Sequence, residues 1–150
     1  MNFLDDAGSQ LLILLDVFIA CILAGAVGYE REMRHKPAGF RTHMIVGGAS
    51  AFLVSLASIS VKVYINDFKD VLDVDPIRII QAIIIGISFI GAGTILKDRH
   101  NEQVSYLTTS ATILFSSGIG MCVALGQYVL ATGVTILVVV INNIFRNLKP

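Results

Sequence analysis

The sequence is poor in charge and in cysteine, and it contains no tryptophan. Only 15% of its residues are Asp, Glu, Lys or Arg, and the formal net charge is zero, so nucleic-acid binding has no electrostatic support. The two cysteines, Cys21 and Cys122, lie inside apolar segments, which indicates small buried hydrophobic residues rather than a disulfide framework or a zinc site. No catalytic motif or glycine fingerprint occurs, so we expect neither enzymatic activity nor a cofactor.

Long apolar segments are what the sequence does contain. Hydrophobic residues make up 55% of the chain, and they group into segments of roughly 18–22 residues, long enough to cross a bilayer as helices. Lipid favours helices because each satisfies its own backbone hydrogen bonds. We therefore expect one all-α transmembrane domain over 1–150, a bundle of about five helices at 9–29, 43–65, 76–96, 105–125 and 127–145. The last two meet at Gly126-Gln127 and predict a hairpin, although one merged or re-entrant element would give four helices.

The distribution of Lys and Arg predicts the orientation. No basic residue precedes the first segment, so the start of a signal peptide is missing and we expect this helix to be retained. Excess positive charge marks cytoplasmic loops, and an odd number of helices places every basic segment there, with the N-terminus outside and the C-terminus in the cytoplasm. The basic residues are Arg31, Arg34, Lys36 and Arg41 in the first loop, Lys97 and Arg99 in the third, and Arg146 and Lys149 in the tail.

The second loop is acidic, with Asp67, Asp70, Asp73 and Asp75 around a single Lys69. Such oxygen ligands would suit a divalent cation. Depletion of positive charge from outer loops and an ordinary Asp-Pro helix start explain the same residues without a metal, and we favour that explanation. The histidines at 35, 43 and 100 are too scattered for a metal site; we expect them near the cytoplasmic surface, solvated or hydrogen-bonded locally.

Small residues recur at helical spacing on four of the segments. Such stripes let helix backbones approach closely, so we expect a tight bundle. A water-filled path is the alternative, but the stripes carry few charges. Their members are Asp16, Ala20, Ala24 and Gly28; Gly47, Ala51 and Ser55; Ala82, Gly86 and Gly93; and Thr112, Ser116, Gly120 and Ala124.

Asp16 is the one carboxylate within these stripes. It lies about 10 Å inside the first helix by the helix rise, where a charge costs on the order of 2.5–3.5 kcal/mol on insertion scales unless it is paired. Arg78, in the first turn of the third helix, opposes the helix dipole and also needs a partner. We predict an Asp16–Arg78 contact; a protonated Asp16 bonded to a hydroxyl is the alternative.

Three motifs together resemble the MgtC/SapB family of bacterial membrane proteins. The first is Gly25-Ala-Val-Gly-Tyr-Glu-Arg-Glu32 with Ala38-Gly-Phe-Arg-Thr-His43; the second is Asp75-Pro-Ile-Arg78 with Gly86-Ile-Ser-Phe-Ile-Gly-Ala-Gly-Thr-Ile95; the third is Leu107-Thr-Thr-Ser-Ala111 with Ile119-Gly120. The match runs from about residue 10 to residue 128. Tyr106 stands where the family usually has Gly, Ser110 replaces a usual Ala, and Leu114 replaces a usual Trp.

The resemblance implies a multi-pass protein of the bacterial inner membrane, tied to magnesium limitation, intracellular survival and ion or energy homeostasis. It implies regulation of other membrane proteins, the ATP synthase among them, rather than transport. Many family members continue into a soluble C-terminal domain that this sequence does not include. The competing functions are a magnesium or small-solute transporter and a homo-oligomeric membrane scaffold, for which the small-residue stripes would suffice.

The predicted topology brings the motifs to one cytoplasmic site. Free N–H groups at the starts of the second and fourth helices suit a carboxylate or an anion. We favour Glu30 or Glu32 in that role, which would make a structural knot; an acidic group of a partner or a small anion is the alternative. The functional candidates are Asp16, Glu30, Arg31, Glu32, Arg41, Thr42, His43, Arg78, Gly91, Gly93, Thr108 and Thr109.

Overall fold

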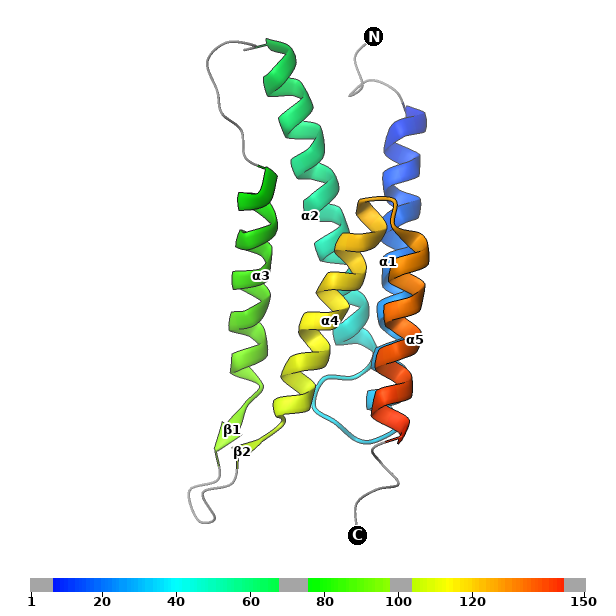
Figure 1. Cartoon of the computed structure of the whole chain (residues 1–150), viewed down its shortest axis with the longest axis vertical. Coiled ribbons are helices and arrows are strands. Elements are labelled where there is room, and N and C mark those ends of the chain that lie inside the picture. Colours follow the sequence, from blue (N-terminus) through cyan, green and yellow to red (C-terminus); the bar gives the residue numbers. More distant parts are fainter. Residues whose placement is uncertain (1–6, 68–75, 98–103, 145–150) are drawn as a thin grey trace.

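The computed structural model describes residues 7–67, 76–97 and 104–144, and these form an all-α bundle. The helices run along one common axis (Figure 1). Their ends differ from the sequence prediction by at most three residues. The described elements are α1 (Ala7–Glu32), α2 (Phe40–Asp67), α3 (Pro76–Gly93), α4 (Leu107–Ala124) and α5 (Tyr128–Ile144), with a two-residue antiparallel pair, β1 (Leu96–Lys97) and β2 (Val104–Ser105), between α3 and α4.

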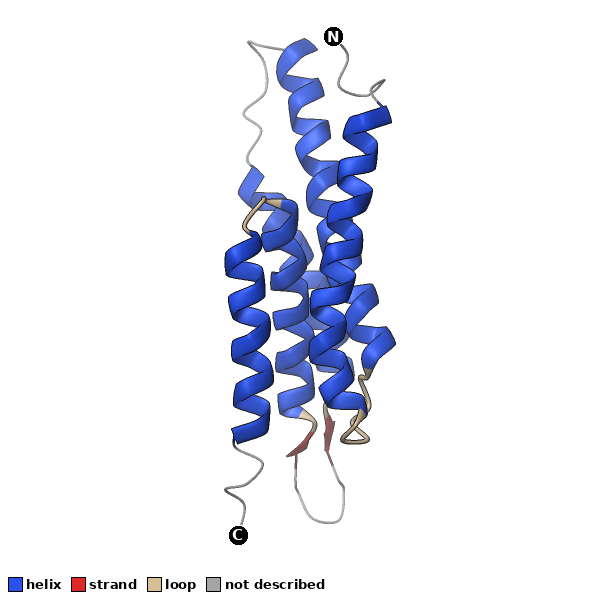
Figure 2. Cartoon of the chain, turned by 90° about the vertical axis from the view of Figure 1, so that its right-hand side faces the viewer, coloured by secondary structure: helices blue, strands red, loops and turns tan. Residues whose placement is uncertain are grey.

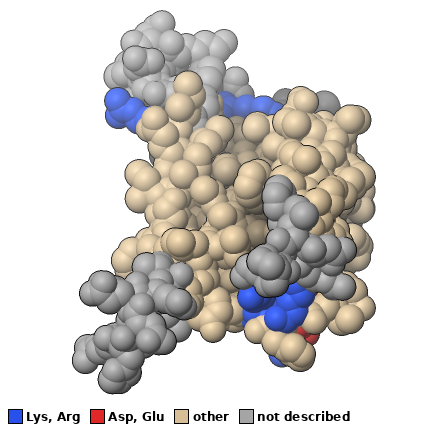
Figure 3. All heavy atoms as spheres, turned by 60° about the horizontal axis from the view of Figure 1, so that its bottom comes forward, with Lys and Arg blue, Asp and Glu red and all other residues tan. Residues whose placement is uncertain are grey.

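Helix length and surface identify a membrane protein. Three helices, over Ala7–Glu32, Phe40–Lys62 and Leu107–Ala124, are long and apolar enough to cross a bilayer, and shorter apolar helices run over Ile77–Gly93 and Tyr128–Ile144. The outward side chains are apolar: Phe89 and Val129 are 82% and 90% exposed. Apolar surface of this extent is stable in lipid rather than in water. On the face in Figure 3, the Lys and Arg atoms gather toward the two ends, with uncharged residues between them.

The core lies where α1, α2 and α4 pack together. A Cβ on Gly120 would overlap the carbonyl oxygen of Gly47, so the backbones of α4 and α2 touch directly. A Cβ on Gly47 would in turn overlap the Cβ of Ala24 on α1. Next to this contact, the hydroxyls of Ser50 and Ser117 are hydrogen-bonded at 2.8 Å. Small residues therefore bring three helices into backbone contact, as expected for association in lipid.

The small residues of α3 behave differently from those of α1, α2 and α4. Ala82, Gly86 and Gly93 are exposed, and a Cβ on either glycine would meet nothing within 4 Å. The prediction that this stripe packs inside the bundle is therefore wrong. Helix α3 lies at one side of the bundle, against α2 and α4 (Figure 1). It contacts them through other residues, because Ile83 is buried and Ile87 packs against a core that includes Ile113.

The chain reverses direction after α1 and after α4 through the same kind of turn. Lys36 N–H donates to Arg31 O and His35 N–H to Glu32 O, with His35 in the left-handed region at φ 52°. Gly126, at φ 72°, ends α4 with the equivalent pair of bonds, and the hairpin to α5 follows. Both ends are Schellman motifs, which satisfy the last free carbonyls of a helix. In two views the α4–α5 turn lies well short of the far ends of α1 and α2 (Figures 1 and 2).

Tyr106, the residue before α4, is also left-handed, at φ 70°. A side chain in this region costs about 1–2 kcal/mol because its Cβ crowds the following carbonyl. Glycine does not incur this cost. The glycine that the family resemblance implies at this position would avoid the cost.

We predict that Gly120→Ala destabilises the bundle strongly and that Gly118→Ala does not. The added methyl at 120 would collide with the α2 backbone, which cannot move aside, whereas a Cβ at 118 meets nothing within 4 Å. Overpacking of this kind costs about 1–3 kcal/mol or more. Thermal unfolding of both variants in the same detergent measures the difference. Equal melting temperatures would contradict the direct contact between α2 and α4.

Candidate functional site

The charged motifs meet at one end of the bundle, which we call the motif end. It comprises the last turn of α1, residues 33–39, the first turns of α2 and α4, the last turn of α3 and the last residues of α5. These segments lie at the lower end of the molecule in Figure 1. Because α2 and α4 both begin here and α1, α3 and α5 end here, free helix termini and charged side chains are concentrated in one layer.

Arg31 is the buried centre of the motif end. It occupies the last turn of α1 and is only 3% exposed. Its Nη2 donates to Thr109 Oγ1 at 2.8 Å and to Thr108 Oγ1 at 3.2 Å, both in the first turn of α4. Its Nε–H is buried and has no hydrogen-bond partner within the described part of the chain. The guanidinium thus links α1 to α4 while one of its donors stays unsatisfied.

Glu30 connects α1 to the end of α5. Its carboxylate pairs with Arg34 one turn later on α1, and its Oε2 accepts a hydrogen bond from Asn142 Nδ2 at 2.9 Å. Arg34 Nη2 also donates to Asn143 Oδ1 at 2.8 Å. Arg34 was expected only to orient the first loop, and Asn142 and Asn143 were not among the predicted site residues. The sequence feature that could have pointed to Asn142 and Asn143 is that two adjacent polar residues occur in the last turn of an apolar helix.

Glu32 joins α1 to the start of α2. Its Oε2 accepts a hydrogen bond from the backbone N–H of Phe40 at 2.8 Å. A carboxylate at this position satisfies a free donor and complements the positive end of the helix dipole. A Cβ on Gly39 would press on Glu32 Oε2, so the glycine leaves room for this contact. Glu32 therefore has the structural role considered for one of the two glutamates, although the contact lies on the exposed surface.

His43 is fully buried between α2 and α4, so it is not solvated, but it is hydrogen-bonded locally, which is one of the two predicted alternatives. Its Nδ1–H donates to Gly39 O at 2.9 Å, since a carbonyl only accepts, and its Nε2 lies 3.3 Å from Thr112 Oγ1. The same hydroxyl lies 2.9 Å from Thr109 O. A neutral imidazole leaves Nε2 as an acceptor, so the Thr112 hydroxyl then serves either the ring or the carbonyl. His43 thereby connects the two helix starts.

Comparison with known proteins identifies the family to which these motifs belong. A model described as the MgtC family matches residues 17–150. The chain belongs to the MgtC family. The match includes all the motifs on which the resemblance rests and the whole of the motif end.

Named relatives of this MgtC-family chain come from several bacteria. It is 34% identical over 140 residues to the Escherichia coli K12 protein named "Putative magnesium transporter YhiD", covering 90% of this chain and 61% of that protein. It is 36% identical over 116 residues to Protein SapB of Bacillus subtilis, covering 77% and 49%. It is 34% identical over 134 residues to Protein MgtC of Salmonella typhimurium LT2, covering 89% and 52%. The chain thus spans about half to three fifths of these relatives. No solved structure matches it.

Of the remaining residues of the family motifs, only some pack against other elements at the motif end. Gly91 is buried against the first turn of α4, where a Cβ would press on Ser110 Oγ. Gly93, by contrast, faces open space. Arg41 is exposed and Thr42 is half-buried in the first turn of α2. Of these residues, Gly91 has a close-packing role and Arg41 is presented at the surface.

Asp16 lies far from the motif end, and its predicted contact with Arg78 is wrong. Its Oδ1 accepts a hydrogen bond from the Tyr128 hydroxyl at 2.7 Å. Helix α1 packs on α2, α4 and α5, whereas α3, which carries Arg78, lies against α2 and α4. The alternative named a hydroxyl as the partner of Asp16, and Asp16 does bond to one, as the acceptor. It lies level with the α4–α5 turn, because Tyr128 is the first residue of α5.

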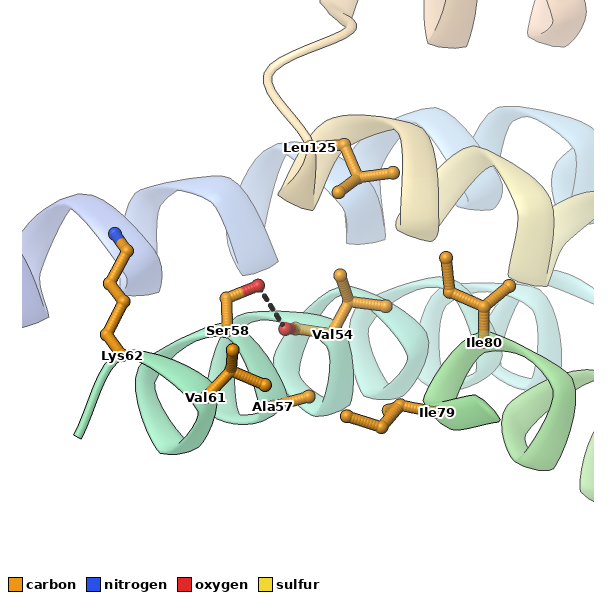
Figure 4. A pocket seen from close by; sticks show the side chains of 8 residues that line it. All are labelled: Val54, Ala57, Ser58, Val61, Lys62, Ile79, Ile80 and Leu125. Atoms are coloured by element: carbon orange, nitrogen blue, oxygen red, sulfur yellow. Dashed lines mark hydrogen bonds between the residues drawn. The ribbon is translucent and has the colours of Figure 1, made fainter. Parts of the chain in front are cut away.

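A cavity of about 240 Å³ lies between α2, α3 and the end of α4, away from the motif end (Figure 4). Apolar side chains from the three helices line it, Val54, Ile80 and Leu125 among them, and Lys62 stands at one edge of the view. The Ser58 hydroxyl donates to Val54 O at 2.9 Å and so is engaged within its own helix. This lining is suited to an acyl chain rather than to an ion.

Several predicted features lie outside the described residues. They are Asp70, Asp73 and Asp75 of the acidic loop, and the basic or histidine positions Arg99, His100, Arg146 and Lys149. Within 7–67, 76–97 and 104–144, no group of three or more His, Cys, Asp or Glu residues is placed to hold a metal ion.

We predict that Thr109→Val destabilises the protein more than Thr108→Val. The Thr109 hydroxyl is fully buried and is the nearer acceptor for Arg31, so its loss leaves a buried charge without its principal partner, at a cost of about 1–3 kcal/mol. Thr108 is exposed, and water can replace its hydroxyl. Thermal unfolding in detergent compares the two variants. If both lower the melting temperature equally, Arg31 does not depend on the buried hydroxyl.

Proposed function

We propose that this chain is a non-enzymatic protein of the bacterial inner membrane that modulates other membrane proteins in magnesium, ion or energy homeostasis. Its contact surface is the motif end, which the distribution of Lys and Arg predicts to be cytoplasmic. The observation that carries the proposal is the backbone contact at Gly47 and Gly120, which leaves no space between α2 and α4 at that level of the bundle. Function is then exerted at the surface rather than through the centre.

The polar groups inside the bundle support this proposal. Ser50 donates to Val46 O and is bonded to Ser117, and Thr135 donates to Ala131 O, so these hydroxyls serve helix backbones and each other. A transport path requires polar groups directed into a continuous space. In the described part of the chain, the cavities beside α1 and between α2 and α3 are lined almost wholly by apolar side chains.

The charged surface of the motif end gives a partner something to bind. His35 and Lys36 in the loop, and Arg41 at the start of α2, are exposed. Helix termini and the bundle packing hold the backbone beneath them in place. A rigid basic surface at the membrane boundary favours an acidic segment of another membrane protein. The family resemblance makes the ATP synthase one candidate partner.

Transport of magnesium or a small solute is the second candidate, favoured by the name of the YhiD relative. One structural feature fits it: α3 stops at Gly93 and the chain continues as strand β1. Transporters place substrates at broken helices, usually in paired halves. Within the described ranges, α3 has no structural counterpart with a similar break, so the modulatory role is preferred.

A homo-oligomeric scaffold is the third candidate, and the exposed face of α3 favours it. Ala82, Gly86 and Gly93 form a small-residue surface that no other helix of this chain covers in the described structure. Small residues on a lipid-facing helix promote close helix–helix association. Self-association through α3 is compatible with modulation through the motif end, because the two surfaces differ.

Purified protein in liposomes that contain a magnesium-sensitive dye should show no uptake above protein-free vesicles. The close contact between α1, α2 and α4 at Gly47 and Gly120 is the reason for this expectation. Asp16→Asn and Tyr128→Phe serve as paired variants, since each removes one side of the same hydrogen bond. Sustained uptake by the parent protein that Asp16→Asn abolishes would overturn the proposal in favour of transport.

Site-specific photo-crosslinking in native membranes tests the contact surface. A photoreactive residue at position 41 should capture a different membrane protein, which mass spectrometry identifies. A photoreactive residue placed in that partner should capture this chain in return. The matched probe at position 86, on the exposed face of α3, should instead capture a second copy of this chain. Lys36→Glu should weaken capture at 41 and leave capture at 86 unchanged. Only self-links from both positions would contradict modulation and favour the scaffold.

A further inference from the structure

The start of α4 presents backbone donors without an acceptor within the described chain. Its N-cap residue, Tyr106, makes no side-chain capping bond. The N–H of Ser110 bonds to Tyr106 O, whereas the N–H groups of residues 107–109 have no partner within the described chain. The contrast with α2 is direct, because Glu32 accepts from the N–H of Phe40. Helix α4 therefore presents free donors and the positive end of its dipole at the motif end.

A buried cation lies at this same positive helix end. Arg31 is 3% exposed and contacts both threonines of the first turn of α4. A guanidinium beside a helix N-terminus is electrostatically unfavourable, and a buried charge requires compensation. The neighbouring carboxylate of Glu30 pairs with Arg34 through Oε1 and accepts from Asn142 through Oε2, while Oε1 makes no hydrogen bond within the described chain. Within the described chain, no carboxylate bonds to Arg31.

Several donors at this position have no acceptor within the described chain. Arg31 Nε–H is buried without a partner. Nε and Nη2 share one edge of the guanidinium, so this donor faces the same side as the threonine hydroxyls. Both hydroxyls accept from Nη2, so their own O–H groups are left to donate, and neither has an acceptor in the described structure. Convergent donors and a positive charge are the features of an oxyanion site.

We propose that a phosphate group binds where Arg31 meets the first turn of α4. The guanidinium supplies the charge, and the hydroxyls of Thr108 and Thr109 with the first N–H groups of α4 supply the remaining hydrogen bonds. The ligand enters from the side of Thr108, which is exposed, whereas Thr109 is fully buried. A phosphate fits better than a single carboxylate because its three or four oxygens match several convergent donors.

Two sources supply this chemistry, a phospholipid headgroup and soluble inorganic phosphate. A groove of about 270 Å³ between α3 and α4 begins at the same turn, with Leu107, Ser110 and Leu114 on its α4 side and Ile87 opposite. An acyl chain in this groove would place its headgroup beside Thr108. Soluble phosphate would reach the site without using the groove. Neither case depends on the proposed modulation of partner proteins, because purified protein suffices for binding.

Delipidated protein in a phosphate-free maltoside detergent tests the site. Inorganic phosphate is titrated at constant ionic strength and followed by phosphorus NMR line broadening, and phosphatidylglycerol binding is counted by native mass spectrometry. We expect saturable binding of at least one ligand, with sulfate competing against inorganic phosphate and chloride not competing. Binding of phosphate alone identifies a soluble ligand, and binding of the lipid alone identifies a headgroup.

Three variants separate the site from general charge attraction. Thr108→Val should weaken binding about tenfold, the effect of one hydrogen bond to a charged group. It should fold normally because the residue is exposed. Arg31→Lys should weaken binding further, since it keeps the charge but loses the planar fork. Arg41→Gln removes an exposed cation at the same end, outside the proposed phosphate site, and should leave the binding of both ligands unchanged. Absence of saturable binding of both ligands, or equal losses in Arg41→Gln and Thr108→Val, would overturn the proposal.

Discussion

The direct contact between the backbones of α2 and α4 at Gly47 and Gly120 is the constraint on which the rest of this structure depends. In lipid, helices gain nothing from hiding apolar side chains from one another, so close approach and hydrogen bonds must hold them together. The same crossing admits Ala24 of α1 against Gly47, which makes a three-helix centre with no room for a larger residue. It also sets the register of α4 on α2, which brings Ser50 to Ser117 and His43 to Thr112.

With that register set, the last turn of α1 becomes a junction between helices. Successive residues of a helix point about 100° apart, and Glu30, Arg31 and Glu32 use this to reach three different elements. Glu30 bonds to Asn142 of α5, Arg31 bonds to the first turn of α4, and Glu32 bonds to the start of α2. A charged triplet in an apolar chain is thus explained as three separate links.

The three links are not equivalent electrostatically. Glu32 places negative charge at a helix N-terminus, which the dipole favours, whereas Arg31 places positive charge at another, which it disfavours. The first contact is complete in itself. The contact of Arg31 with α4 leaves the buried Arg31 Nε–H without a partner and the first N–H groups of α4 without an acceptor within the described chain. This difference separates a structural contact from a candidate binding site, although both come from neighbouring residues of one motif.

The sequence by itself determined the helical class, the position of each helix to within three residues and the family, because these depend on local apolar length and on contiguous motifs. It also predicted that Arg31, Thr108 and Thr109 lie at the same end of the bundle, since the order and direction of the helices decide which of their ends meet. Only the tertiary structure decided that Asp16 bonds to Tyr128 rather than approaching Arg78, that His43 is buried, and that the small face of α3 is left uncovered. Periodicity shows which residues share a face of one helix, but which helix that face meets is set by packing between segments far apart in the chain.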